Sequence, residues 1–409
     1  MVKFLTLDDV DVEGRTVLLR VDLNTPIEPG TGRLLDTTKF VRHAETIREL
    51  VSRGAKVVVL THQGRRGGPD FTTLHRHAEV LSEVLGREVK YVDDLFGSKA
   101  KEAVRSLRRG EVLLLENVRI WEGEDVDRPP EGHANTPLVT ELAPLADLFV
   151  NDAFASAHRS HASLVGFTVV LPSVAGRVME RELRAIRRVL EEPRHPSVYI
   201  IGGAKVDDAA KACRNLLERG VADVILTGGV AAMMMAAAKG VDLGPSNMRV
   251  LRDAGYAKLA REVEELLAKH GERIRVPVDF AVETPAGERL ELPLEGFPRG
   301  ERIMDIGSET AVAYGTEVLG AETVVMSGPM GVYEKPRFAV GTACLFAYMA
   351  ASRAYSLIGG GHTVAAAEKF KVSDKFSYVS TGGGALVAAL MGEELPAVRA
   401  LEVAAQRSG

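Results

Sequence analysis

Cysteine is scarce in this sequence: Cys213 and Cys344 are the only two cysteines among 409 residues, and they lie far apart. The sequence therefore offers no disulfide framework and no cysteine-based zinc site, and a reducing compartment is favoured. Long apolar runs are also missing. The longest one, residues 230–238, falls well short of the roughly 20 residues that span a membrane. We expect it to form a buried helix, because its small side chains and methionines suit close packing.

No charge of one sign dominates. Lysine and arginine number 51 and aspartate and glutamate 56, which gives a formal net charge of −5. This balance argues against a nucleic acid or an anionic membrane as a partner of the whole surface. The first residues, MVKFLTLDDVDVEG, contain acidic side chains too early for a signal peptide. We therefore expect a cytoplasmic protein with no nucleic-acid partner and no membrane partner.

Short runs of valine, isoleucine and leucine alternate with helical patterns along the chain. The alternation predicts parallel sheets that helices cover on both faces. We expect an α/β protein with two open parallel-sheet (Rossmann-like) domains. The expected strands are residues 16–21, 56–60, 111–115, 147–150, 197–201, 223–227, 274–278, 323–326, 355–358 and 376–379. The clearest expected helices are residues 39–52, 73–85, 256–269 and 341–354.

A helical pattern at 172–193 separates the two halves. Its apolar residues recur at steps of three and four, charges fill the other face, and a proline lies at each end. Taken alone, this pattern is also typical of an ordinary surface helix. Its position between two α/β halves favours a joining element, so we predict domains at 1–171 and 193–392 with an interdomain helix and hinge at 172–192.

Arginine and histidine mark the strand ends of the first half, where ligands bind in open α/β sheets. Arg20, Arg65, Arg119 and Arg159 each follow or end an expected strand. Convergent guanidinium groups suit phosphates and carboxylates, and Asp22 and Asn24 offer acceptors for hydroxyls. The set points to a small phosphorylated acid. The alternative is four separate salt bridges.

Glycines mark the strand ends of the second half. A single Gly-Gly pair indicates no more than a tight turn, but five clusters on one sheet favour a nucleotide or polyphosphate site. Neither G-x-x-x-x-G-K-[ST] nor G-x-G-x-x-G is present, so P-loop and ordinary dinucleotide sites lose support. The clusters are Gly202-Gly203, Gly228-Gly229, Gly328 with Gly331, Gly359-Gly360-Gly361 and Gly382-Gly383-Gly384.

Other polar residues carry weaker signals. Lys205 follows a strand and could reach a transferring phosphoryl group, although a lone lysine there is more often solvated. Glu334 could accept hydrogen bonds from a ribose, although an exposed acid needs no such role. His158 and His161 form a weak metal pair, and ordinary hydrogen bonds are the favoured role for both. His75 and His77 are expected on the surface.

Several motifs in the same order resemble those of the phosphoglycerate kinase family, nearly from end to end. The spellings THQGR and GGGH are similar to those of archaeal members. The motifs are RVDLN at 20–24, THQGR at 61–65, LENVR at 115–119, NDAFASAHRSHAS at 151–163, GGAKVDD at 202–208, MDIG at 304–307, GPMGVYE at 328–334, GGGH at 359–362 and STGGGA at 380–385.

The resemblance implies reversible phosphoryl transfer between 1,3-bisphosphoglycerate and Mg-ADP, giving 3-phosphoglycerate and ATP in glycolysis and gluconeogenesis. It implies that the first domain binds the glycerate, that the second binds the nucleotide, and that residues 393–409 pack back on the first domain. It also implies a monomer. The implied substrate residues are Asp22, Leu23, Asn24, Lys39, His62, Gln63, Gly64, Arg65, Arg119 and Arg159. The implied nucleotide residues are Gly203, Lys205, Gly228, Gly229, Glu334, Gly359, Gly360, Gly361, His362 and Thr363.

The sequence departs from the family pattern at several positions. Lys39 stands where most members have an arginine, and Arg42 lies a turn later. His362 stands where most members have an aspartate that helps to hold the metal, which leaves Mg²⁺ more dependent on phosphate oxygens and water. We therefore assign no protein ligand to the metal. Ala209 replaces a common second lysine, with Lys211 two residues on.

The implied chemistry needs no general base, because the nucleophile is an anionic phosphate oxygen and the leaving group is a carboxylate. Positive charge around the moving phosphoryl group is what the transition state requires. Our catalytic candidates are Lys205, Lys39 and the N–H groups of Gly382, Gly383 and Gly384, brought to the substrate by hinge bending. Two alternatives stay open: a nucleotide sensor without transfer activity, and a dehydrogenase with an unusual dinucleotide site.

Overall fold

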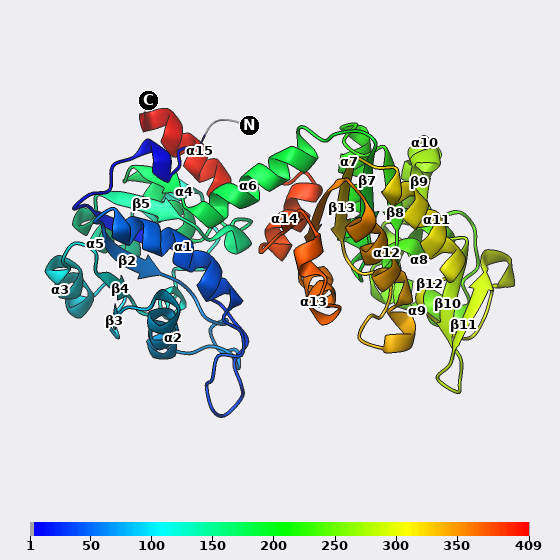
Figure 1. The fold of residues 1–409 in the computed structure, drawn as a ribbon, viewed down its shortest axis with the longest axis horizontal. Coiled ribbons are helices and arrows are strands. Elements are labelled where there is room, and N and C mark those ends of the chain that lie inside the picture. Colours follow the sequence, from blue (N-terminus) through cyan, green and yellow to red (C-terminus); the bar gives the residue numbers. More distant parts are fainter. Residues whose placement is uncertain (1–3, 409) are drawn as a thin grey trace. The chain divides into compact units, whose positions relative to one another are not determined.

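Two parallel six-stranded sheets organise the chain (Figure 1). The computed structural model describes residues 4–408 and consists of two units. Unit 1 comprises Met1–Leu183 with Glu394–Gly409, and unit 2 comprises Arg184–Glu393. The predicted fold class, two parallel-sheet α/β domains, is confirmed. Among the helices of the described residues, none has the length and apolar character that crossing a bilayer requires.

The sheet of unit 1 has the strand order β3-β4-β2-β1-β5-β6, and all its pairs are parallel. Its strands are β1 (Thr16–Arg20), β2 (Lys56–Leu60), β3 (Val89–Tyr91), β4 (Val112–Leu114), β5 (Leu148–Asn151) and β6 (Ser173–Ala175). Its helices are α1 (Thr38–Ser52), α2 (His75–Leu85), α3 (Ser98–Ser106), α4 (Pro130–Ala134), α5 (Pro137–Leu142) and α15 (Pro396–Ser408). The last helix, α15, contacts β6.

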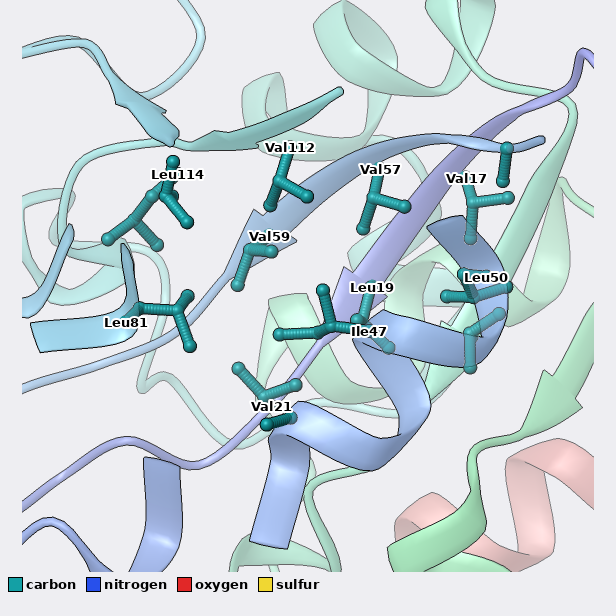
Figure 2. Close-up of a cluster of buried hydrophobic side chains, with 14 of the residues drawn as sticks. Val17, Leu19, Val21, Ile47, Leu50, Val57, Val59, Leu81, Val112 and Leu114 are labelled. Atoms are coloured by element: carbon teal, nitrogen blue, oxygen red, sulfur yellow. The ribbon is translucent and has the colours of Figure 1, made fainter. Parts of the chain in front are cut away.

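Both faces of this sheet are buried, as a parallel sheet requires. Successive side chains of a strand point to opposite faces. Val17 and Leu19 of β1 pack with Ile47 of α1 and Leu81 of α2 on one face (Figure 2). Leu18 belongs to the core of the other face, with residues of α3 and α5. The apolar run of the strand therefore follows from burial on two sides.

Unit 2 is built on the order β15-β14-β13-β7-β8-β9, again parallel throughout. These strands are β7 (Ser197–Ile201), β8 (Val224–Thr227), β9 (Ile274–Arg275), β13 (Thr323–Ser327), β14 (Tyr355–Gly359) and β15 (Tyr378–Val379). The helices are α7 (Val206–Glu218), α8 (Gly229–Ala238), α9 (Pro245–Asp253), α10 (Ala260–His270), α11 (Ser308–Leu319), α12 (Val340–Ala351), α13 (Gly361–Lys369) and α14 (Gly383–Leu390). Residues 231–236 of α8 are buried, as expected for that apolar run.

A small antiparallel sheet in unit 2 was not predicted. It has the order β11-β10-β12, from β10 (Asp279–Glu283), β11 (Arg289–Pro293) and β12 (Arg302–Ile306). Its strands contain many charged residues, so they lack the apolar runs on which the prediction relied. The predicted strand at 274–278 is also too long, because β9 ends at Arg275 and Pro277 has no N–H for a sheet hydrogen bond.

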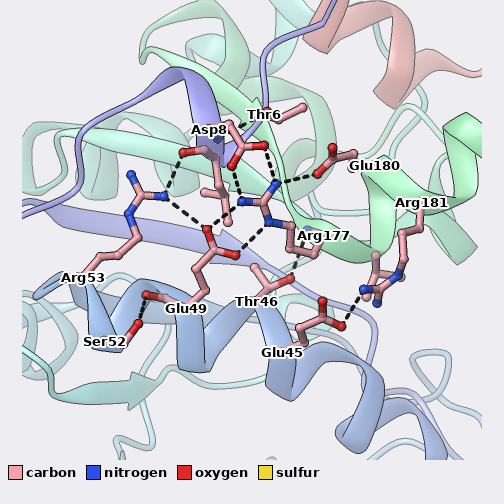
Figure 3. Close-up of polar contacts among 12 residues, drawn as sticks. Thr6, Asp8, Glu45, Thr46, Glu49, Ser52, Arg53, Arg177, Glu180 and Arg181 are labelled. Carbon is pink, nitrogen blue, oxygen red and sulfur yellow. Dashed lines mark hydrogen bonds and ion pairs between the residues drawn. The ribbon is translucent and has the colours of Figure 1, made fainter.

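The joining helix, α6 (Arg177–Leu190), begins later than the helical pattern at 172–193 predicted. Residues 173–175 instead form β6, which pairs with β5. The first turn of α6 is bound to α1 and to the N-terminal 3₁₀ turn (Figure 3). Arg177 forms ion pairs with Asp8 at 2.6 Å, Glu49 at 2.7 Å and Glu180 at 2.8 Å. The chain passes from unit 1 to unit 2 within this helix.

Candidate functional site

The carboxyl ends of β4, β2, β1 and β5 lie side by side in the unit 1 sheet. Ligands bind at this edge in open parallel sheets. The residues predicted to bind substrate follow these strands, except Lys39, which lies in the first turn of α1. They are Asp22, Leu23 and Asn24 after β1, His62, Gln63, Gly64 and Arg65 after β2, Arg119 after β4, and Arg159 after β5.

Asp22 is buried, and donors surround its carboxylate. Oδ1 accepts hydrogen bonds from Lys39 Nζ at 3.1 Å and from the Asn24 N–H at 3.0 Å. Oδ2 lies 3.4 Å from the Ser156 hydroxyl. Burial alone would raise the pKa of Asp22, but the neighbouring positive charges, that of Lys39 foremost, lower it well below the usual range. Asp22 is therefore a carboxylate at neutral pH.

Asn24 joins the loop after β1 to the loop after β2. Its Oδ1 accepts a hydrogen bond from the Gly64 N–H at 2.8 Å, and the Gly64 carbonyl accepts one from the Arg119 guanidinium. Gly64 has φ +66°, and a Cβ there would lie 2.5 Å from the backbone of Asp70. Only glycine fits this position. Gly64 therefore holds the loops after β1, β2 and β4 together through its N–H and its carbonyl.

Leu23 and Gln63 are fully buried, so their side chains support these loops from inside. The Leu23 N–H donates to the Thr61 hydroxyl at 2.9 Å. The Gln63 amide makes two hydrogen bonds to the backbone of Thr25, one as acceptor at 3.0 Å and one as donor at 2.9 Å. Both residues therefore hold the shape of the loops.

Arg65, Arg119 and Arg159 form a cluster of positive charge. Across residues 4–408, none of the three forms an ion pair. Burial and then the charge of Arg159 lower the pKa of Arg119. Burial and then the charges of Arg159 and Arg119 lower the pKa of His161 to about 3. Such a surplus of positive charge at a sheet edge is suited to an anionic ligand.

Arg20 does not belong to this open cluster, so the expectation that all four arginines face a ligand is wrong for it. Its side chain is 1% exposed. Nε donates to the Ser163 hydroxyl at 2.8 Å, and that hydroxyl donates to Glu124 at 2.6 Å. Burial lowers the pKa of Arg20 to about 10, against the opposing charge of Glu124. Arg20 is therefore a buried cation whose charge is balanced by Glu124 inside unit 1.

His62 lies between Arg20 and Asp22. Its Nδ1 is 3.2 Å from the Arg20 guanidinium, which can only donate. Nδ1 therefore accepts, and the ring proton lies on Nε2. Burial, together with the charge of Arg20, holds the pKa of His62 well below its usual range. His62 is a neutral donor in this site.

The prediction that His77 lies on the surface is wrong, whereas His75 is exposed as expected. His77 faces the core with Leu81, one turn further along α2, and its ring lies 5.7 Å from that of Phe40. Nε2 is 3.0 Å from Gln63 Oε1, and burial lowers the pKa of His77 to about 4.

His158 and His161 belong to no cluster of three or more metal-ligating side chains within the part of the chain that the structure describes. The expected hydrogen bonds are only partly present at His158, whose Nε2 accepts from Arg159 at 3.4 Å while its buried Nδ1 has no hydrogen-bond partner among the described residues.

In unit 2 the glycine turns follow neighbouring strands and interlock. The Gly203 N–H donates to the Pro329 carbonyl at 3.0 Å, and the Gly229 N–H donates to the Met330 carbonyl at 2.9 Å. The Gly203 carbonyl accepts from the Val230 N–H at 2.8 Å. The turns after β7, β8 and β13 are thus one hydrogen-bonded unit.

Two further turns continue this row. The Gly328 N–H donates to the Thr363 hydroxyl of α13 at 2.7 Å. A Cβ at Gly383, the first residue of α14, would lie 3.1 Å from the backbone nitrogen of Gly361. The glycines predicted from the sequence therefore lie along one edge, where α8, α13 and α14 begin.

A cavity of about 230 Å³ opens beside these turns. Gly203, Gly229, Glu334 and His362 line it, and the Glu334 carboxylate lies 3.8 Å from His362 Nδ1. Its apolar wall was not predicted, because most of it comes from the small antiparallel sheet and α8. This wall contains Met233, Val250, Phe280, Ile303 and Val332.

The remaining catalytic candidates are on unit 2. Lys205 precedes α7, its side chain is 81% exposed, and Nζ lies 3.5 Å from Asp208. The Gly382 N–H donates to the Ser380 hydroxyl at 3.3 Å. Gly383 and Gly384 lie in the first turn of α14, where N–H groups have no acceptor within the helix.

The fold and these sites define a two-unit α/β protein whose sheet edges are suited to phosphorylated ligands. Comparisons with known proteins place it more narrowly. The family profile "Phosphoglycerate kinase" matches residues 7–393. The phosphoglycerate kinase of Methanothermobacter thermautotrophicus is 49% identical over 98% of this chain and 97% of its own length. That of Methanothermus fervidus is 45% identical over 100% of this chain and 99% of its own length.

Solved structures agree. The phosphoglycerate kinase of Pyrococcus horikoshii superposes with a TM-score of 0.90 at 42% identity, over 98% of this chain and all of that one. The Coxiella burnetii enzyme gives a TM-score of 0.84 at 32% identity, with the same coverage. This chain belongs to the phosphoglycerate kinase family.

Proposed function

We propose that this chain catalyses reversible phosphoryl transfer between 1,3-bisphosphoglycerate and ADP, giving 3-phosphoglycerate and ATP in glycolysis and gluconeogenesis. The observation that carries the proposal is the cluster of Arg65, Arg119 and Arg159 at one sheet edge, three cations that form no ion pair within residues 4–408. A ligand with phosphate and carboxylate groups would neutralise them. Membership of the phosphoglycerate kinase family supports the same reaction.

The glycerate is assigned to unit 1. The arginine cluster binds its phosphate, and the ionised Asp22 accepts a hydrogen bond from its hydroxyl. His62, a neutral donor, and Asn24 complete the contacts. Lys39 lies against Asp22 and supplies positive charge close to the carboxyl end of the substrate.

The nucleotide is assigned to unit 2. The backbone of the glycine turns approaches its phosphates, the apolar cavity wall packs on its base, and Glu334 accepts hydrogen bonds from its ribose. The residues assigned to this site are Gly203, Lys205, Gly228, Gly229, Glu334, Gly359, Gly360, Gly361, His362 and Thr363.

Phosphoryl transfer then requires that the two substrates be positioned in line and that positive charge surround the moving phosphoryl group. Lys205, Lys39 and the N–H groups of Gly383 and Gly384 stabilise the equatorial oxygens of the moving phosphoryl group. The Gly382 N–H joins them only if it leaves Ser380. The two ligands meet by hinge bending around residues 172–192, which also excludes water.

Magnesium enters on the nucleotide. Phosphate oxygens and water are its main ligands, as is usual for this ion. Bound there, Mg²⁺ would neutralise charge on the phosphates. We further propose that the chain works as a cytoplasmic monomer, with boundaries near 1–171, 172–192, 193–392 and 393–409.

A coupled assay tests the function. Phosphorylation of 3-phosphoglycerate by Mg-ATP is followed by reduction of the acyl phosphate, for wild type, Lys205→Ala and Lys211→Ala. Both lysines pair with an aspartate near the start of α7, at 3.5 Å and 2.8 Å. We expect kcat to fall about 100-fold or more for Lys205→Ala, as when one transition-state donor is removed, and less than about twofold for Lys211→Ala.

The outcomes separate the alternatives. Equal activity of both variants would show that Lys205 has no catalytic role, although the chain would still be a phosphoglycerate kinase. Wild type that binds ATP without transferring phosphate would instead support the nucleotide sensor.

A further inference from the structure

We propose that His43 is a positioning residue that links the loop of Asp22 to the first turn of α6. It lies on α1, is 4% exposed, and is not among the residues assigned to either ligand. The proposal rests on the proposed function only where it assigns glycerate binding to Asp22. The structural link itself is independent of that assignment.

His43 accepts a hydrogen bond with one ring nitrogen and donates one with the other. The backbone N–H of Asp22 donates to Nε2 at 3.2 Å. Because an N–H can only donate, Nε2 accepts and the ring proton lies on Nδ1. Nδ1 then donates to Oδ2 of Asp152 at 2.8 Å. One rigid neutral ring therefore connects a strand-end loop to a fully buried carboxylate.

The second oxygen of Asp152 caps α6. Oδ1 accepts from the N–H groups of Val178 at 2.8 Å and Met179 at 3.3 Å. A helix start normally takes such a cap from the residue just before it. Here that residue is Gly176, which has no side chain, so Asp152 supplies the cap from the end of β5.

The Asp152 carboxylate packs tightly against the backbone of Gly176. A Cβ at Gly176 would lie 2.3 Å from Asp152 Oδ1, so any other residue would displace the carboxylate. The preceding donor, the Arg177 N–H, is taken by the Thr46 hydroxyl of α1 at 3.1 Å. Every N–H of the first turn of α6, from 177 to 179, therefore bonds to a group of unit 1.

The consequence is a coupling between ligand and helix. Displacement of the Asp22 backbone moves a ring that cannot bend, and the ring moves or releases the carboxylate that caps α6. The chain passes between the units within α6, so glycerate bound at Asp22 changes the stability of the element that joins them. Local coupling of this kind appears in amide hydrogen exchange.

The first experiment needs no ligand. Hydrogen exchange of the full chain is compared between wild type and Asp152→Asn, which weakens the relay from its far side. Losing one buried hydrogen bond of about 1 kcal/mol should raise exchange of the Asp22 amide about fivefold. Unchanged exchange at Asp22, with faster exchange at Val178 and Met179, would overturn the link.

The second experiment adds 3-phosphoglycerate, with binding followed by calorimetry. We expect the ligand to slow exchange of the Val178 and Met179 amides in wild type. His43→Gln should keep this effect, because its amide carries an acceptor and a donor at a spacing similar to that of the ring nitrogens. His43→Leu should lose it while still binding the ligand. His133→Leu, a loss of another buried histidine of unit 1, should leave it in place.

The two proposals fail differently. Protection of α6 that persists in His43→Leu would overturn the relay. Wild type that shows no binding of 3-phosphoglycerate would contradict the proposed function, and the ligand-free comparison would still decide the relay. If His43→Leu does not fold, His43→Gln and Asp152→Asn carry the test.

Discussion

Lys39 Nζ lies 3.1 Å from Asp22 Oδ1, which joins the first turn of α1 to the loop after β1. The family resemblance leads us to expect an arginine at this position, so we ask whether this lysine fills its role. We predict that Lys39→Gln lowers kcat/KM for 3-phosphoglycerate about 10- to 100-fold, the loss of a charged hydrogen bond of about 1.5–3 kcal/mol. Steady-state kinetics at saturating ATP measure it.

Arg42 provides the comparison one turn further along α1. Arg42→Gln should change kcat/KM less than about threefold if Lys39 carries the charge. The reverse order of the two losses would transfer the role to Arg42. Lys39→Arg should restore most of the activity if positive charge at this position is what matters.

Arg177 and Arg181 make a matched pair on α6 (Figure 3). Arg177 is 17% exposed and pairs with three carboxylates, whose contacts raise its pKa. Arg181 is 43% exposed and pairs with Glu45 at 2.5 Å. We predict that Arg177→Ala lowers the free energy of unfolding by about 2–3 kcal/mol, because it removes three ion pairs at once, one of them to the buried carboxylate of Glu180.

Arg181→Ala should lower the free energy of unfolding by less than about 1 kcal/mol, as for exposed ion pairs. Denaturant unfolding of both variants decides the matter. Equal losses would mean that the three contacts of Arg177 add nothing beyond one surface pair.

The accuracy of the predicted helices and strands depends on the kind of sequence pattern behind each one. β2 (Lys56–Leu60) and β7 (Ser197–Ile201) match their predicted bounds, because a strand buried on both faces appears as one apolar run. The antiparallel strands β10 to β12 have no such run and were missed. α6 was predicted too early, since its apolar spacing extends into β6, and only tertiary pairing with β5 distinguishes the two.

The candidate site was predictable where side chains follow strands. The positions of Asp22 and the arginine loops along one edge follow from parallel topology alone. That Arg20 turns inward depends on Ser163 and Glu124, which lie far away in sequence. His43 lacked a signal for the same reason, because its partners come from the ends of β1 and β5.

His77 should make the fold sensitive to acid. Burial lowers its pKa to about 4 in the folded chain, against 6.5 for an unperturbed histidine. Between these values the unfolded chain binds more protons, so stability is present above pH 6.5 and is lost as the pH falls toward 4. The full difference amounts to about 3 kcal/mol.

We therefore predict that His77→Leu reduces the fall in unfolding free energy between pH 7 and pH 4 by about 2–3 kcal/mol. His75→Leu, two residues earlier and exposed, should leave that fall unchanged. Denaturant unfolding at several pH values measures both. Identical pH profiles for wild type and His77→Leu would contradict the prediction.

The glycine turns of unit 2 differ in how strictly they need glycine. Gly328 has φ +94°, and a Cβ there would lie 2.3 Å from the carbonyl carbon of Gly202. Gly361 has no atom within 4 Å of such a Cβ and no positive φ.

We predict that Gly328→Ala lowers the free energy of unfolding by about 3 kcal/mol or more, because two backbone segments must separate. Gly361→Ala should change it by less than about 0.5 kcal/mol, since alanine suits the first turn of a helix. Thermal unfolding compares the two, and equal melting temperatures would contradict the packing of the turn after β13 against that after β7.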